Sequence, residues 1–227
     1  MHLVVSGEGK GDIGIGSYVD GTFIPAPMYY LIDKVIEKKL DYSIYELTPT
    51  EITFIPKVEL SKICKSIKSL AGKKRIKETG YFYKNALGLS KVAKGKGDDV
   101  IAILFRDADG TGTTDLNVYH KKIESIENAF EKEGVNGVAM IPNPKSEAWL
   151  ICALKESKYQ SCNLLEKRSG NDDSPNNLKK ELGEILKFND LEYYDINEMI
   201  KDEHIDIEKM DIDSFNYFRE KLKKIIL

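Results

Sequence analysis

The stretch "DDVIAILFRDADG", residues 98–110, decides the fold. Its apolar run over residues 100–105 has no polar alternation, which is typical of a strand buried on both faces of a parallel sheet. Asp107 and Asp109 follow this run at once. The stretch therefore predicts a central parallel strand with carboxylates at its carboxyl end.

Further strands and helices alternate along the chain. The alternation predicts an α/β fold with a mostly parallel sheet flanked by helices. In such sheets ligands collect at the carboxyl ends of the strands, so we expect the loops after Ser6, Phe105 and Ile141 to meet. Strands are predicted at 2–6, 42–47, 51–55, 100–105 and 135–142, a long loop at 7–27, and helices at 28–40, 58–70, 81–95, 116–134, 145–154 and from 178 onward.

Composition indicates a globular protein. The chain has 227 residues, of which 41% are hydrophobic and 31% charged. It has no apolar run long enough for a membrane span and no leader pattern, so we expect a cytoplasmic protein without membrane contact. The three cysteines, Cys64, Cys152 and Cys162, have no metal-binding spacing, and we expect reduced thiols and no zinc site.

Charge is distributed unevenly. Residues 57–97 hold twelve Lys and Arg but two acids, whereas residues 181–227 hold thirteen acids and seven Lys and Arg. We predict an α/β domain over residues 1–155, with a basic insertion at about 57–97, and an acidic helical C-terminal extension over 156–227. The turn-rich segment 168–177 is typical of a linker and marks another candidate boundary.

The glycine-rich segment "VVSGEGKGDIG", residues 4–14, is not a standard phosphate loop. It lacks the first Gly and the Ser or Thr of a Walker A motif. Gly9, Gly11 and Gly14 do match G-x-G-x-x-G, but the Gly- and Pro-rich sequence that follows does not open a helix. What remains is a pair of acids, Glu8 and Asp12, in a loop that can bring them together.

The acidic turn after the central strand suits a cation. Residues two apart in extended chain point the same way, so Asp107 and Asp109 can share one hard divalent ion. An EF-hand is excluded because its twelfth position is Val118. A simple Asx turn is one alternative. Another is the D-x-D-G-T motif, which resembles haloacid-dehalogenase-like phosphatases with Asp107 as nucleophile and Asp109 as acid/base.

A third loop, "MIPNPKSEAWLICAL" at residues 140–154, places Lys145 and Glu147 at the start of a helix. Together the three loops resemble the TOPRIM domain of topoisomerases, primases and OLD-type nucleases, in which a glutamate follows the first strand and a D-x-D pair follows a later one. Glu8 matches the glutamate, and Asp107 and Asp109 match the pair. Asp12 and Glu147 match additional acids of OLD-type nucleases. The Pro-Ser-Glu-Ala-Trp-Leu turn also looks like small bacterial TOPRIM-like proteins, some linked to phage defence.

The resemblance implies a TOPRIM or Rossmann-like fold and Mg²⁺- or Mn²⁺-dependent hydrolysis of nucleic acid. Glu8, Asp107 and Asp109 would hold one ion, and Asp12 and Glu147 a second. Lys10 or Lys145 would neutralise charge on the phosphate, which gives Glu8, Asp107, Asp109 and Lys145 as catalytic residues.

The basic segment is the predicted nucleic-acid surface, for DNA or RNA. A solvated basic helix is the alternative. A non-catalytic TOPRIM subunit of a defence complex, or an enzyme that needs a protein partner such as an ATPase, also stays open. The predicted nucleic-acid-binding residues are Lys10, Lys73, Lys74, Arg75, Lys77, Lys84, Lys91, Lys94 and Lys96.

Overall fold

A computed structural model describes residues 1–67, 77–108 and 116–226, except the side chains of 77, 78 and 116. A four-stranded sheet in the order β4-β1-β5-β6 lies at its centre, and all three pairings in it are parallel. The predicted α/β class with a parallel sheet is confirmed. The strands are β1 (His2–Gly7), β4 (Ile52–Pro56), β5 (Val100–Phe105) and β6 (Asn136–Met140).

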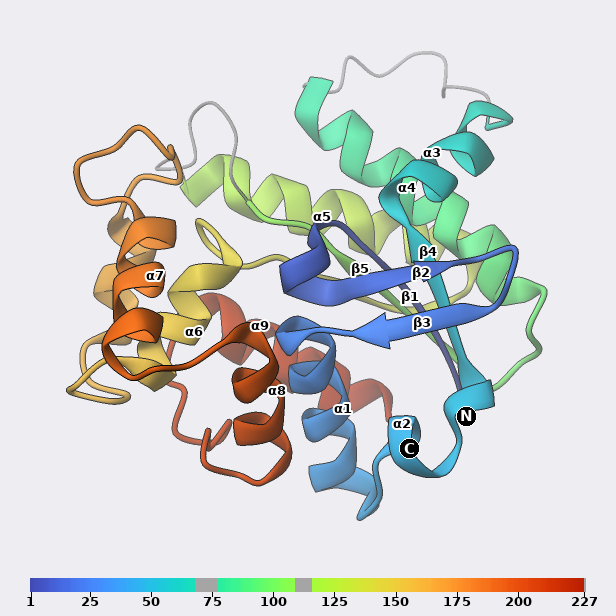
Figure 1. Cartoon of the computed structure of the whole chain (residues 1–227). Coiled ribbons are helices and arrows are strands. Elements are labelled where there is room, and N and C mark those ends of the chain that lie inside the picture. The colour runs from blue at the N-terminus through green and yellow to red at the C-terminus, as the bar shows by residue number, and fades with distance from the viewer. Residues whose placement is uncertain (68–76, 109–115, 227) are drawn as a thin grey trace.

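Helices cover both faces of the sheet (Figure 1). Alternate residues of β1 divide between the two cores: Leu3 and Val5 face one, and Val4 faces the other. Within the described residues, no helix combines the length and apolar character needed to cross a membrane. Helices α1 (Pro27–Leu40), α6 (Ser146–Leu154) and α9 (Asp213–Ile225) pack in the first core, and α3 (Lys57–Lys65), α4 (Lys77–Lys94) and α5 (Leu116–Glu133) in the second.

The basic segment forms the connection between β4 and β5. It contains α3 and α4, which pack on the sheet through residues such as Leu60 and Leu89. Strand β1 lies between β4 and β5, so the segment crosses over β1 on one face. Its helices therefore form the crossover connection that covers one face of the sheet.

The predicted loop 7–27 is ordered more fully than the sequence suggests. It contains a π-helical turn, η1 (Gly9–Ile13), and a hairpin of β2 (Gly14–Ser17) and β3 (Thr22–Pro25). Gly14 has φ 123°, and a Cβ there would lie 2.3 Å from the carbonyl oxygen of Ile24. Glycine is therefore required where the turn enters the hairpin.

The strand predicted at 42–47 is wrong, because α2 (Ile44–Leu47) occupies this segment. The Ser43 hydroxyl accepts a hydrogen bond from Glu46 N at 3.1 Å. The buried Asp33 carboxylate accepts one from Ile44 N at 2.9 Å. These side chains satisfy the first N–H groups of the turn, and this favours a helix start over the β-branched and aromatic pattern. A short 3-10 turn, η2 (Pro49–Glu51), leads into β4.

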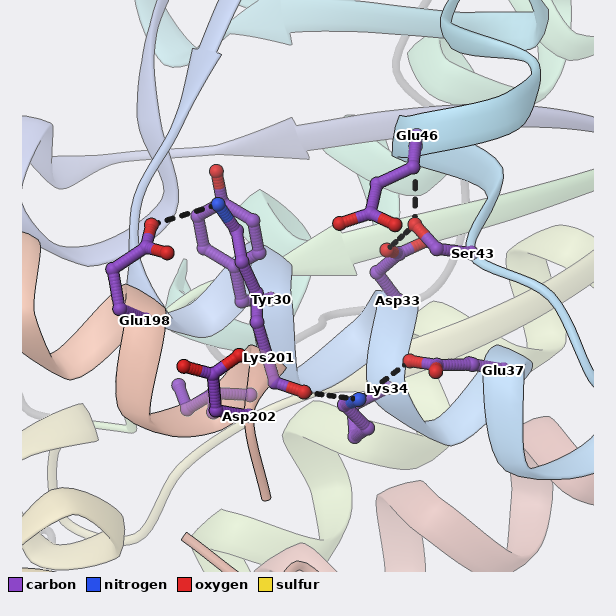
Figure 2. Close-up of a pocket in the computed structure, with 10 residues that line it drawn as sticks. Tyr30, Asp33, Lys34, Glu37, Ser43, Glu46, Glu198, Lys201 and Asp202 are labelled. Carbon is purple, nitrogen blue, oxygen red and sulfur yellow. Dashed lines mark hydrogen bonds and ion pairs between the residues drawn. The ribbon is translucent and has the colours of Figure 1, made fainter. Parts of the chain in front are cut away.

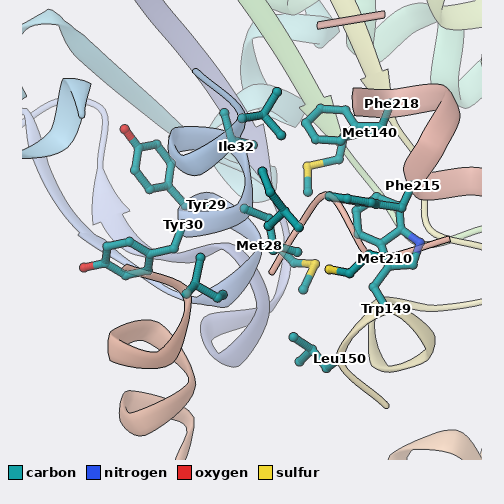
Figure 3. Close-up of a cluster of buried hydrophobic side chains, with 14 of the residues drawn as sticks. Met28, Tyr29, Tyr30, Ile32, Met140, Trp149, Leu150, Met210, Phe215 and Phe218 are labelled. Atoms are coloured by element: carbon teal, nitrogen blue, oxygen red, sulfur yellow. The ribbon is translucent and has the colours of Figure 1, made fainter. Parts of the chain in front are cut away.

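The C-terminal helices share the first core with the α/β domain (Figure 3). Trp149 of α6 lies with its ring centroid 5.0 Å from that of Phe215 and 6.0 Å from that of Phe218, both in α9. Met28 of α1 and Met140 of β6 belong to the same buried cluster. The core therefore continues across the predicted boundary near residue 155. The other elements here are η3 (Cys162–Lys167), α7 (Leu178–Phe188) and α8 (Tyr193–Lys201).

The cysteines differ from the expectation of three reduced thiols. Cys152 and Cys162 form a disulfide, because the turn after α6 brings their Cα atoms within 5.3 Å. Cys64 is free and buried, and burial raises the pKa of its thiol.

Candidate functional site

The sheet has a topological switch point between β1 and β5. The chain passes from β1 to β4 on one side and from β5 to β6 on the other. In open α/β sheets, ligands bind at the carboxyl ends of the two strands that flank such a point. Glu8 directly follows β1, and Asp107 lies two residues beyond β5.

Ser146 joins the three predicted acidic loops. Its backbone N–H donates to Asp107 Oδ1 at 2.9 Å, and its hydroxyl donates to Asp12 Oδ1 at 2.9 Å. Asp107 thus satisfies the first N–H of α6. The loops after β1, β5 and β6 therefore meet, and Glu147 is the next residue along α6.

Glu147 is buried without full compensation. It is 8% exposed, and its Oε2 has no hydrogen-bond partner among the described residues. Burial raises the pKa of its carboxyl, and the nearby Asp12 carboxylate raises it further, although the Glu147 backbone N–H and two lysines, Lys145 and Lys179, lower it. Burial likewise raises the pKa of Asp12, against the hydrogen bond from Ser146. Two carboxylates that repel each other in a buried place need a cation or a proton.

The donors are of the chemical type that a hard divalent cation prefers. They are carboxylates alone, and the unpartnered Glu147 oxygen is a free ligand position. As the side chains stand, no three acids, histidines or cysteines within residues 1–67, 77–108 and 116–226 are grouped closely enough to hold one ion. Asp109, the predicted partner of Asp107, lies outside the described residues.

Lysines surround the acids at this edge. Lys57, the first residue of α3, forms an ion pair with Glu8. Lys145 is buried and pairs with Asp172 Oδ1 at 2.6 Å. Lys10 is exposed on η1. Lys57 could have been found from the sequence, because it follows a predicted strand and so lies at the same edge of the sheet as Glu8.

The other predicted nucleic-acid-binding lysines lie elsewhere or outside the described residues. Helix α4 leads into the start of β5, so Lys91, Lys94 and Lys96 lie toward the edge where strands begin, opposite the acidic site. Lys94 pairs with Glu133 Oε2 at 2.7 Å. Lys84 lies in the middle of α4 and is partly buried. Residues Lys73, Lys74 and Arg75 are outside the described part of the chain, as is the side chain of Lys77.

The C-terminal helices add groups that the sequence did not predict. Lys179 of α7 is close enough to Asp12 and Glu147 to lower their pKa values. Tyr193, at the start of α8, faces the η1 turn, since a Cβ on Gly11 would lie 3.9 Å from its ring. No local pattern marks these residues, because packing of distant helices places them here.

A polar cavity of about 300 Å³ lies between α1 and α8, and several of the charged groups that line it pair with one another (Figure 2). Asp33 accepts hydrogen bonds from the Ser43 hydroxyl at 2.5 Å and from the first N–H of α2. Lys34 Nζ donates to the Lys201 carbonyl at 2.7 Å and pairs with Glu37 at 2.6 Å. These contacts fasten α8 and α2 to α1, so the cavity is explained by docking of the helices.

No protein-family model, curated protein or solved structure matches this chain.

Proposed function

We propose that the chain is a TOPRIM-like nuclease that hydrolyses phosphodiesters of nucleic acid with Mg²⁺ or Mn²⁺. The observation that carries the proposal is the link through Ser146 between Asp12 and Asp107, with Glu147 beside it. Acids that follow three different strands lie near one another at the switch point of a parallel sheet. Their repulsion in a buried site is costly to the fold, which indicates a functional arrangement.

The residues that would hold metal are Glu8, Asp12, Asp107, Asp109 and Glu147. When bound, Mg²⁺ or Mn²⁺ would act as a Lewis acid on the phosphoryl oxygens and supply a nucleophilic water near neutral pH. Asp107 also fixes the start of α6, so it orients Glu147. Ser146 holds Asp12 in position by its hydroxyl.

Lysines at the same edge support an anionic substrate. Lys10 is exposed on η1. Lys145 is buried and lies two residues before Glu147 in the chain. Both would neutralise charge that develops on the phosphate. Lys57 and Lys179, which sequence reasoning missed, join them as candidate phosphate contacts. A role in anti-phage defence and a partner such as an ATPase stay predictions.

The experiment is a cleavage assay on labelled single-stranded DNA, plasmid DNA and RNA, each with Mg²⁺, Mn²⁺ or EDTA. We expect cutting of at least one substrate with metal and none with EDTA. The same preparations are given p-nitrophenyl phosphate, for which we expect no turnover. Turnover of that monoester alone would favour the hypothesis of a phosphatase that uses Asp107. Binding without cleavage under all conditions would favour a non-catalytic subunit.

Acid should weaken the site at a higher pH than ordinary carboxylates would allow. The raised pKa values of Asp12 and Glu147 mean that protons compete with metal above the usual values of 3.8 and 4.5. We expect Mn²⁺ affinity, measured by calorimetry, to fall as the pH drops through this raised range, with proton release on binding. An affinity that holds constant down to pH 4.5 would contradict the metal site.

A further inference from the structure

A groove of about 380 Å³ opens directly beside Glu8. It lies between β2 and the junction of β4 with α3, and every residue that lines it is described. Its volume is within the range of small-ligand sites. The apolar lining residues are Ile15, Phe54, Pro56 and Val58, and the charged ones are Glu8, Lys10 and Lys57.

We infer that this groove holds an unpaired nucleobase next to the phosphodiester at the acidic site. The inference rests on the proposed function and names its substrate class, a strand with an accessible base. A paired base has both faces covered in its stack, so it enters such a groove only from a single strand or after flipping.

The apolar walls suit the face of a base. Val58 is 67% exposed and Ile15 is 42% exposed, although both border a cluster of charged groups. Exposed apolar surface that lines a groove and is rimmed by polar residues often marks a ligand-binding site. Bases stack on aromatic side chains with little dependence on sequence, and they are also held between apolar side chains in the pockets of base-flipping enzymes.

The polar groups of the groove suit the rest of a nucleotide. Lys10 and Lys57 would contact the phosphates on either side of the base. Strand β2 pairs with β3 alone among the residues that the structure includes, and Ala26 N donates to Ile13 O on that side at 3.2 Å. Backbone groups alternate along a strand, so Gly16 directs its N–H and C=O to the other edge, which borders the groove. They could bond the edge of the base.

The test compares two single-stranded probes of about 12 nucleotides, oligothymidylate and an abasic backbone of equal length and charge. Affinities are measured by fluorescence anisotropy in Ca²⁺ for the wild type, Val58→Asp and Val19→Asp. Val58 is the second residue of α3, where an acid is compatible with the helix dipole. Val19 is 85% exposed outside the groove, so its variant adds the same charge without touching the walls.

We expect the wild type and Val19→Asp to favour oligothymidylate by roughly 5- to 150-fold, the range for stacking of one base. In Val58→Asp this ratio should fall to about one, while the added charge weakens both probes alike. Equal affinity of the wild type for both probes, or an unchanged ratio in Val58→Asp, would overturn the groove. If metal-dependent cleavage persists in that case, the nuclease proposal still holds without the groove. If cleavage is absent but the wild type keeps the expected preference for oligothymidylate, the groove still holds without the nuclease proposal.

Discussion

Replacement of Glu147 by Gln is expected to abolish metal-dependent cleavage and, at the same time, to stabilise the protein. Mutation of a residue that only hydrogen-bonds to a metal ligand lowers metal affinity or activity by about 10- to 100-fold. Loss of a ligand itself should therefore lower activity by at least about 100-fold. The fold should gain, because Gln removes a buried charge that lies near Asp12 and has an oxygen without a partner among the described residues. Relief of one such group is worth about 1 kcal/mol, which is about 2–4 °C in Tm for a chain of this size.

The gain should depend on pH with a definite sign. The folded-state pKa of Glu147 lies above the usual 4.5, so the folded state holds this proton more tightly than the unfolded state. The contribution of this carboxyl to stability is therefore fully present below pH 4.5 and is lost as the pH rises through the raised pKa. The Tm difference between Glu147→Gln and wild type should grow from near zero at pH 4 to its full value at neutral pH.

The matched control is Glu156→Gln, which makes the same change at an exposed position just beyond α6. It should leave both Tm and cleavage unchanged. Added Mg²⁺ should raise the Tm of the wild type and of this control but not that of Glu147→Gln. A Glu147→Gln protein that still cuts, or one that melts below the wild type at neutral pH, would contradict the assignment.

Much of the site was accessible from the sequence because strand ends can be predicted. Asp107 follows a run of apolar residues that is typical of a buried strand, and Glu8 and Glu147 follow two other predicted strands. Parallel strands then bring these ends to one edge, and Ser146 connects two of the loops. The TOPRIM identity stays a prediction, since the layered sheet is shared by many folds.

The rest depends on contacts between residues far apart in the chain. Residues 44–47 form a helix partly because the Asp33 carboxylate accepts a hydrogen bond from Ile44 N. Asp33 is 11 positions away from Ile44 in the chain. Lys179 and Tyr193 reach the site because α7 and α8 pack against the first core. No local sequence pattern predicts this packing. Charge counting also could not place the lysines after residue 90 relative to the acids, since the direction of α4 decides toward which edge of the sheet they lie.

The shared core of Figure 3 leads to the second large effect, on stability. Phe218 of α9 is fully buried, and its ring lies 6.0 Å from that of Trp149 in α6. Truncation of a buried Phe to Ala costs about 3–5 kcal/mol, because apolar contacts are lost and a cavity remains. At about 2–4 °C per kcal/mol, Phe218→Ala should melt roughly 6–20 °C below the wild type.

The matched control is Phe188→Ala, since Phe188 is 90% exposed at the end of α7 and its loss should shift Tm by less than about 2 °C. Trp149 is the only tryptophan, and it is buried in the shared core, so its fluorescence follows that core directly. We expect fluorescence and far-UV circular dichroism to report one transition that moves as a whole in Phe218→Ala. If α9 instead melted alone, with β6 and α1 unaffected at the wild-type temperature, then the C-terminal helices would be an independent unit. A single transition would mean that Lys179 and Tyr193 are held at the acidic site by the same core that folds the sheet, so that any loosening of α9 also disturbs the site.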